Sequence, residues 1–235
     1  MLHGTPVVFV VDDDPSVRRS LELLIESAGW HAETFAFAQE FLSCPRVAAP
    51  NCLVLDVNLP DLDGLELQKR VIAERSDMPI IFISGHGDVP MTVRAMKAGA
   101  MEFFTKPLGS EALLNAISQA IERSSAVLAE ETAMRSLRDC HASLTARERE
   151  VMVLVVSGLL NKQIGAELDI SEITVKAHRG SMMRKMRASS LAHLVTMAAK
   201  LGIAPCDPTG KERGLWLANG CGINRLNVNH PKVKA

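Results

Sequence analysis

The chain has 235 residues, of which 47% are hydrophobic and 23% charged, a composition that permits two modest folded domains and excludes a largely disordered protein. No apolar stretch reaches the length of a membrane span, and no basic region followed by an apolar block marks a signal peptide. The five cysteines lack the spacing of a zinc site or a disulfide framework, so we expect reduced thiols in a cytoplasmic protein that does not bind membranes.

The formal net charge of -1 hides an uneven distribution of charge. Residues 1–125 carry 17 acidic and 10 basic side chains, whereas residues 143–203 carry 5 acidic and 9 basic ones. An acidic first half and a basic second part indicate two different tasks, and the basic part suits a polyanionic partner.

Short apolar runs alternate with amphipathic stretches through the first half. Runs such as VVFVV, CLVLDV and IIFIS are typical of strands buried on both faces of a parallel sheet. Strands are predicted at residues 7–11, 31–36, 52–57, 80–84 and 102–106, and helices at residues 16–28, 38–44, 64–75, 89–98 and 110–123. This alternation predicts a flavodoxin-like α/β fold, a doubly wound five-stranded parallel sheet, for residues 1–123.

The rest of the chain divides into three parts. Residues 124–142 remain rich in helix formers and predict a helical linker, and residues 143–203 predict a small all-α unit. Residues 204–235 are rich in Gly, Asn and Pro without periodicity, which predicts a disordered tail.

Polar side chains follow four of the predicted strands. Asp12 and Asp13 follow the first strand, Asp56 ends the third, Ser84 the fourth and Lys106 the fifth. Because the carboxyl ends of parallel strands meet at one edge of a sheet, where ligands bind, these side chains are expected to converge. Each residue alone has a structural explanation as a cap or turn, and their joint placement is what favours a site.

Carboxylates gathered in one pocket require a cation, and oxygen ligands suit a hard ion, Mg²⁺ or Mn²⁺. Asp56 is then placed to attack a phosphoryl group and form an aspartyl phosphate. Lys106 and the metal would neutralise charge on the phosphoryl oxygens, while the Ser84 hydroxyl could donate a hydrogen bond to one of them. We assign the neighbouring Asp14, Asp61 and Asp63 to caps or turns.

The segments VFVVDDDPSVR, LVLDVNLPDLDG and FISGHGDVPMTVRAMKAGAMEFFTKP resemble the receiver domain of two-component response regulators, specifically the FixJ-type, StyR-like branch. The resemblance implies that Asp56 accepts phosphate from a sensor histidine kinase. It also implies a metal site formed by Asp13, Asp56 and the Asn58 backbone carbonyl, with Asp12 assisting through water.

The same resemblance implies a switch. Ser84 moves toward the phosphoryl group, the ring of Phe103 follows inward, and a cis bond before Pro107 aims Lys106. Phe103 is otherwise an ordinary core residue of a strand. The altered surface is then a dimer face that forms on phosphorylation, and its expected members are Val93, Met96, Lys97 and Glu102.

The basic part predicts three helices in close succession. Thr145 with Glu148 three residues later forms a capping box, and Asn161 and Ser171 are candidate caps for the next two helices. The short turn at residues 169–171 matches helix-turn-helix geometry, whose second helix enters the major groove of DNA. A helical unit that docks another protein is the alternative.

Helical phase sorts the third helix into two sides. Val175, Met182 and Met186 share the side expected to pack. The opposite side holds Ile173, Lys176, Ala177, Gly180, Arg184 and Arg187. Lys176 is the best candidate for a base contact, whereas Thr174 and His178 suit phosphate contacts.

The segment TAREREVMVLVVSGLLNKQIGAELDISEITVKAH resembles the LuxR-type helix-turn-helix. In that class the positions of Lys176, Ala177 and Gly180 face bases, and a fourth helix, here residues 190–202, pairs the DNA-binding domains through Leu191, Leu194 and Val195. Gly180 has no side chain, so one expected contact is absent.

These observations predict a cytoplasmic, phosphorylation-controlled transcription regulator that dimerises and binds promoter DNA, most often as an activator, with RNA polymerase as a further candidate partner. Its phosphoryl chemistry is directed at itself, so we do not expect an enzyme. The alternatives are a Mg²⁺-dependent phosphatase or phosphotransferase, an adaptor protein, and a regulator that dimerises without phosphate. Asn58, two residues after Asp56, stands where such an enzyme would need a second acid, and this argues against the first alternative.

Overall fold

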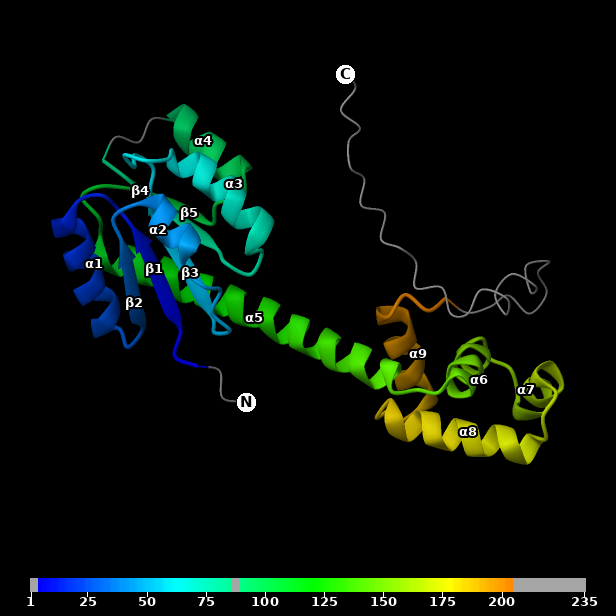
Figure 1. Ribbon diagram of the computed structural model, residues 1–235. Helices are drawn as coiled ribbons and strands as arrows, with labels where there is room; N and C mark the ends of the chain where they lie inside the picture. Colours follow the sequence, from blue (N-terminus) through cyan, green and yellow to red (C-terminus); the bar gives the residue numbers. More distant parts are fainter. Residues whose placement is uncertain (1–3, 86–88, 205–235) are drawn as a thin grey trace, which may run out of the picture. The chain divides into compact units, whose positions relative to one another are not determined.

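The computed structural model describes residues 4–85 and 89–204 (Figure 1). The chain separates into two compact units between Glu131 and Thr132, and each is described by itself. Within the described residues no helix is long and apolar enough to cross a membrane. Apart from Ala204, the predicted tail lies outside the described residues.

The first unit contains a five-stranded sheet in the order β2-β1-β3-β4-β5, and all neighbouring strands run parallel. The strands are β1 (Val7–Val11), β2 (His31–Phe35), β3 (Asn51–Asp56), β4 (Ile80–Ser84) and β5 (Glu102–Thr105). The inner strands β1, β3 and β4 are buried along their whole length, which is why their sequences are continuously apolar. The predicted doubly wound α/β fold is confirmed.

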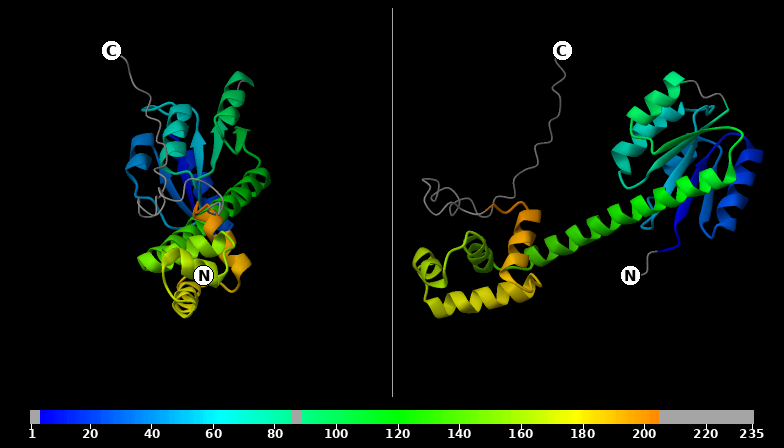
Figure 2. Two further views of the ribbon diagram at one scale, coloured as in Figure 1. Left: turned by 90° about the vertical axis from the view of Figure 1, so that its right-hand side faces the viewer. Right: turned by 180° about the vertical axis from the view of Figure 1, so that it is seen from behind.

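Helices cover both faces of the sheet (Figure 2). They are α1 (Pro15–Ser27), α2 (Ala38–Ser43), α3 (Gly64–Glu74), α4 (Val89–Lys97) and α5 (Ser110–Ala142). On one face, Leu21 and Ile25 of α1 join Ile117 of α5 in a core with alternate strand residues. On the other face, Phe41 of α2 and Leu67 of α3 pack with the remaining strand residues. Strand side chains alternate between two buried layers, and this fixes the register.

Three aspartates near the strand ends accept amides at helix starts, and two of them do so as the sequence predicts. Asp14 caps α1 by accepting from the Ser16 amide, and Asp63 caps α3 by accepting from the Leu65 amide. The third, Asp61, does not cap the helix that follows it. Its two carboxylate oxygens accept the amides of Ala38 and Gln39 at the start of α2, 3.2 and 3.0 Å away, so it joins the loop after β3 to a helix more than twenty residues earlier.

Up to Ala204, where the described part of the second unit ends, its regular structure is all-helical, as predicted. Its helices are α6 (Ala146–Val156), α7 (Asn161–Leu168), α8 (Glu172–Lys185) and α9 (Leu191–Lys200). The predicted side of α8 is buried, with Val175, Met182 and Met186 in one core with residues of α6, α7 and α9. The last part of α5 contributes Leu137 to that core. Helix α5 runs without interruption through the predicted boundary between residues 123 and 124.

The caps of the second unit agree with the sequence except at one helix. Thr145 and Glu148 form the predicted capping box, and the Ser171 hydroxyl accepts from the Thr174 amide. Asn161 does not cap α7. It is the first residue of that helix, and its side-chain oxygen accepts instead from Arg179 of α8, 3.0 Å away.

Helices α7 and α8 approach closely at Gly165. A Cβ there would lie 2.8 Å from the Ile170 carbonyl oxygen, so only glycine fits this position. Asp169 ends α7 with a left-handed φ of 52°, which makes the sharp turn into α8. The predicted helix-turn-helix geometry is therefore present.

Candidate functional site

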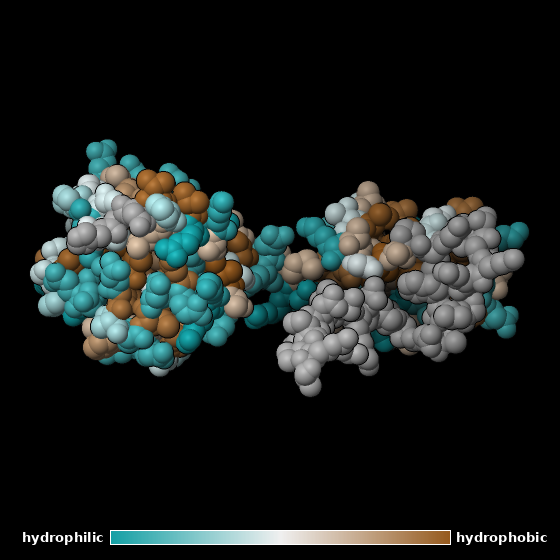
Figure 3. Space-filling model, turned by 90° about the horizontal axis from the view of Figure 1, so that it is seen from above, coloured by the Kyte–Doolittle hydropathy of each residue, from teal (hydrophilic) through white to brown (hydrophobic). Residues whose placement is uncertain are grey.

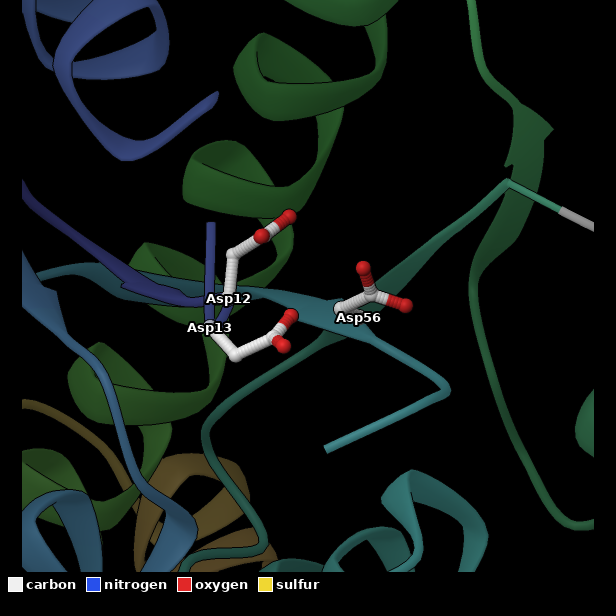
Figure 4. A group of neighbouring side chains, drawn as sticks. All are labelled: Asp12, Asp13 and Asp56. Atoms are coloured by element: carbon white, nitrogen blue, oxygen red, sulfur yellow. The ribbon is translucent and has the colours of Figure 1, made fainter. Parts of the chain in front are cut away.

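An acidic pocket lies beyond the carboxyl ends of β1 and β3. Asp12 and Asp13 follow β1, and Asp56 is the last residue of β3 (Figure 4). One carboxylate oxygen from each lies within 4.8 Å of the others. Asp12 and Asp56 are buried, whereas Asp13 is exposed to solvent. The predicted convergence of carboxylates from separate strands is therefore present.

Lys106 holds two of these carboxylates together. Its Nζ donates to Oδ2 of Asp12 at 2.7 Å and to Oδ2 of Asp56 at 2.6 Å. Burial acts to lower the pKa of Lys106, but the two hydrogen bonds and the two negative charges outweigh it, and the net pKa is raised. Burial raises the pKa of Asp12 above its usual range, against the opposing effect of its hydrogen bond to Lys106.

The backbone around the pocket is closely fitted. Oδ1 of Asp56 accepts from the Asn58 amide at 3.0 Å, which fixes the carboxylate relative to the loop after β3. A Cβ on Gly64 would lie 2.6 Å from the Asp56 carbonyl oxygen, so α3 can begin this close to the strand end only with glycine. Gly64 is thus required for close packing and does more than form a turn.

The donor set fits a divalent metal ion of the Mg²⁺ type. It consists of oxygen atoms from three carboxylates, and an open hollow of about 370 Å³ beside it is lined by Asp13, Asn58, Pro60 and Asp63, among others. The hollow leaves room for the water molecules that Mg²⁺ usually retains.

The predicted switch residues lie on the neighbouring strands. Ser84 is buried at the end of β4, and its carbonyl oxygen accepts from the Lys106 amide at 2.8 Å. Phe103 of β5 is partly buried, with its ring centroid 6.1 Å from that of Phe82. The Lys106–Pro107 peptide bond is cis.

The predicted dimer face is on the surface. Val93 is 44% exposed and Met96 41% exposed, while Lys97 and Glu102 are also exposed. Figure 3 shows apolar side chains interrupting the hydrophilic surface of the molecule. The sequence analysis missed Val89, which is 77% exposed at the start of α4 and extends the apolar side chains of this helix.

Helix α8 presents half of the six predicted DNA contacts outward. Lys176, Ala177 and Arg184 are exposed, and Ile173 is 79% exposed beside them. Thr174, His178 and Gly180 are half-buried at the sides of the helix. Nζ of Lys176 lies 3.0 Å from a carboxylate oxygen of Glu172, an exposed pair that DNA phosphates or bases can replace at little cost.

A charge pair between the buried Glu148 and the half-buried Lys185 was not predicted. The carboxylate of Glu148 accepts from Lys185 at 2.6 Å, and this joins α6 to the last turn of α8. Hydrogen bonds from Lys185 and Ser181 lower the pKa of Glu148 to about 2. The capping-box pattern identified Glu148, but only the packing of α6 on α8 shows its second partner.

Two protein families match the chain. Residues 8–118 match the family described as "Response regulator receiver domain", and residues 142–198 match "Bacterial regulatory proteins, luxR family". The first match contains the acidic pocket and the second contains the helix-turn-helix.

Several known proteins are similar over most of their length. Nodulation protein W of Bradyrhizobium diazoefficiens is 48% identical over 198 residues, covering 84% of this chain and 87% of that protein. The response regulator protein TodT of Pseudomonas putida is 44% identical over 201 residues, covering 86% and 88%. The transcriptional regulatory protein FixJ of Bradyrhizobium diazoefficiens is 41% identical over 196 residues, covering 83% and 96%.

A solved structure is also similar. The low-resolution structure of the response regulator StyR matches with a TM-score of 0.78 and 47% identity, covering 84% of this chain and 100% of that one. Pocket, helix-turn-helix and both family matches therefore agree, and the chain belongs to the two-component response regulators that regulate transcription through a LuxR-type DNA-binding domain.

Proposed function

We propose that this response regulator accepts a phosphoryl group on Asp56 from a sensor histidine kinase in the cytoplasm and that the modification controls its binding to promoter DNA. The observation that carries the proposal is the contact of Lys106 with both Asp12 and Asp56, in a pocket to which Asp13 adds a third carboxylate. Asp56 is the central group of this set because it ends the middle strand of the sheet.

In the transfer, a carboxylate oxygen of Asp56 attacks the phosphorus atom of the kinase phosphohistidine. A P–O bond forms, the P–N bond breaks, and the histidine nitrogen leaves with the bonding electrons. Lys106 is placed to stabilise the negative charge on the phosphoryl oxygens, and the Ser84 hydroxyl to donate to one of them. The acceptor is the protein itself, so the reaction modifies the regulator and leaves the kinase with a free histidine.

Mg²⁺ or Mn²⁺ would be held by the carboxylates of Asp13 and Asp56 and the backbone carbonyl of Asn58, with Asp12 assisting through water. When bound, the metal supplies positive charge that offsets the repulsion between the carboxylates and the incoming phosphoryl group. Exposure of Asp13 beside the open hollow supports entry of the ion from solvent.

The proposed switch runs from Ser84 to Phe103. Ser84 moves toward the phosphoryl oxygens and the partly buried Phe103 ring follows inward, with Lys106 held in the pocket by its two carboxylate contacts and Pro107 next to it in the chain. The surface changed by this movement would be the dimer face of Val93, Met96, Lys97 and Glu102. Exposure of two apolar side chains of α4 supports this assignment.

The dimer would then place two copies of α8 in the major groove of a twofold operator. The proposed DNA contacts are Thr174, Lys176, Ala177, His178, Gly180 and Arg184. Leu191 and Val195 of α9 are 42% and 41% exposed, which supports pairing of the DNA-binding domains through this helix. The expectation for Leu194 is wrong, because this residue is fully buried in the core of the second unit. We propose activation of transcription, with RNA polymerase as the partner of the bound dimer.

Mass measurement after treatment with acetyl phosphate and Mg²⁺ tests the phospho-acceptor. The wild-type chain should gain one phosphoryl group, and Asp56→Asn should gain none. Asp63→Asn is the matched control, because Asn caps a helix as well as Asp and this exposed residue lies in the same loop. Equal modification of the Asp56→Asn variant and the wild type would refute the assignment.

A further inference from the structure

Gln68 of α3 is a fully buried polar side chain that reaches the backbone of α4. It is next in sequence to the buried Leu67. Its Nε2 donates to the backbone carbonyl oxygen of Ala95 in α4 at 3.0 Å, so it joins two helices 27 residues apart. Its Oε1 has no hydrogen-bond partner among the described residues.

Helix α4 contacts the core through Ala95 and the partly buried Met91. Ala95 is its one fully buried residue within the described part of the chain, while Val93, Met96 and Lys97 are exposed. The Ala95 carbonyl also accepts from the Ala100 amide at 3.1 Å, which closes the last turn of the helix. Gln68 therefore contacts α4 at the point where the helix enters the core.

This contact is poorly explained as a source of stability. A hydrogen bond within a protein contributes little net free energy, because both groups bind water in the unfolded chain, whereas a buried oxygen without a partner is destabilising. A leucine of similar volume would fill the same space without an unpaired oxygen. What the amide adds is a directional bond to the backbone of α4.

We propose that Gln68 is a positioning residue that holds the C-terminal turn of α4 in its resting position, and that the bond to Ala95 is released when the helix moves on phosphorylation. The inference rests on the proposed function, in which α4 carries the dimer face. A single hydrogen bond has a small net value, so a modest change at the pocket is enough to displace the helix.

Substitution of Gln68→Leu separates the bond from core packing. Amide hydrogen exchange of the unphosphorylated full chain should become about fivefold faster at Ala98, Gly99 and Ala100, whose amides close the last turn of α4. A fivefold shift corresponds to about 1 kcal/mol, the usual net value of one hydrogen bond. Both protomers of a dimer must have α4 displaced, so a fivefold gain in each multiplies to about 25-fold. The dimer dissociation constant without phosphate, measured by sedimentation, should therefore fall by up to that factor.

Ser124→Ala is the matched control. The Ser124 hydroxyl accepts from the Asn51 amide at 3.0 Å, so this variant also loses one buried hydrogen bond of the same unit, but away from α4. It should lower the melting temperature without changing exchange in α4 or dimerisation. The proposal would be overturned if the amides of α4 exchanged in the Gln68→Leu variant at the wild-type rate. It would also be overturned if they exchanged equally faster in the Gln68→Leu and Ser124→Ala variants.

The same experiment distinguishes this proposal from the proposed function. If α4 exchanges faster in Gln68→Leu while the phosphorylated wild type stays monomeric, Gln68 positions the helix and the assignment of the dimer face is wrong. If the phosphorylated wild type dimerises and α4 exchange in Gln68→Leu is unchanged, the dimer face stands and the role of Gln68 is refuted.

Discussion

Nζ of Lys106 lies 2.6 Å from Oδ2 of Asp56, and the same nitrogen donates to the buried Asp12. One cation thus compensates two carboxylates from different strands. Without it, two buried or nearly buried negative charges would face each other, which is unfavourable in a site shielded from water. Lys106 therefore stabilises the resting pocket, and in the proposed mechanism it would meet a phosphoryl group on Asp56.

Replacement of Lys106→Met should have opposite effects on metal binding and phosphoryl transfer. Removal of the ammonium group frees both carboxylates, so Mg²⁺ affinity measured by calorimetry should rise. The rate of modification by acetyl phosphate should fall by about 100-fold, because charge on the phosphoryl oxygens loses its nearest stabilising group. Lys69→Met, at an exposed lysine that pairs with Glu66, should change neither. A lower Mg²⁺ affinity in Lys106→Met would argue against the shared role of these carboxylates.

The Glu148–Lys185 pair predicts a pH dependence for the second unit. The pKa of Glu148 is lowered from 4.5 to about 2. The stability that this carboxylate adds to the folded state is therefore fully present above about pH 4.5 and is lost as the pH falls toward 2. Glu148→Gln keeps a side chain that fits the capping box but removes the charge, and should cost on the order of 1–3 kcal/mol at neutral pH. Thermal unfolding between about pH 6 and pH 3 should show a weaker acid dependence in this variant.

Glu150→Gln is the control for that experiment. Glu150 forms a partly exposed pair with Arg147 one turn away, so its loss should change stability by less than about 1 kcal/mol. If Glu148→Gln and Glu150→Gln lost equal stability and both kept the acid dependence of the wild type, the Glu148–Lys185 pair would not be its source.

Lys176→Ala should weaken selective DNA binding more than general DNA binding. A lysine bound to a base edge contributes about 1–3 kcal/mol of discrimination, so affinity for the operator should fall about 10- to 100-fold with little change on unrelated DNA. Titrations at several salt concentrations separate a base contact from a phosphate contact. Loss of a phosphate contact in the variant would reduce the salt slope by about one. Lys200→Ala, at an exposed lysine of α9, is the control. Equal loss on operator and unrelated DNA would assign Lys176 to a phosphate.

Val93→Asp should prevent dimerisation after phosphorylation. A carboxylate in the centre of an apolar interface loses its water without gaining a partner, so the dimer should weaken by at least about tenfold. Sedimentation with acetyl phosphate measures this. Leu23→Asp on α1 is a control of similar exposure, and it should leave the dimer unchanged. Normal dimerisation of the Val93→Asp variant would exclude α4 from the interface.

The fold and the pocket are accessible from the sequence because both depend on local patterns. Buried parallel strands read as short apolar runs, and the polar residue that ends each run must lie at the carboxyl edge of the sheet. The sequence therefore predicts that Asp12, Asp56 and Lys106 lie together, although Lys106 is 50 residues from Asp56 and 94 residues from Asp12 along the chain. Packing of Val175, Met182 and Met186 follows from helical phase for the same reason.

Contacts between elements that the sequence does not relate were missed. Asp61 stands beside Pro60 like an ordinary turn residue, and only the packing of α2 against the loop shows that it caps that helix. Asn161 has the side chain of a helix cap, yet α8 lies close enough for Arg179 to bind it. In the sequence Gln68 is like any polar residue of an amphipathic helix, and only its contact with α4 shows that it is buried.

A DNA-binding titration with and without acetyl phosphate and Mg²⁺ measures whether phosphate on Asp56 controls DNA binding. Phosphorylation should tighten operator binding by the wild-type chain by at least about tenfold, and the Asp56→Asn variant should bind equally weakly under both conditions. An equal phosphate-dependent gain in operator affinity in the Asp56→Asn variant would show that phosphate on Asp56 does not control DNA binding.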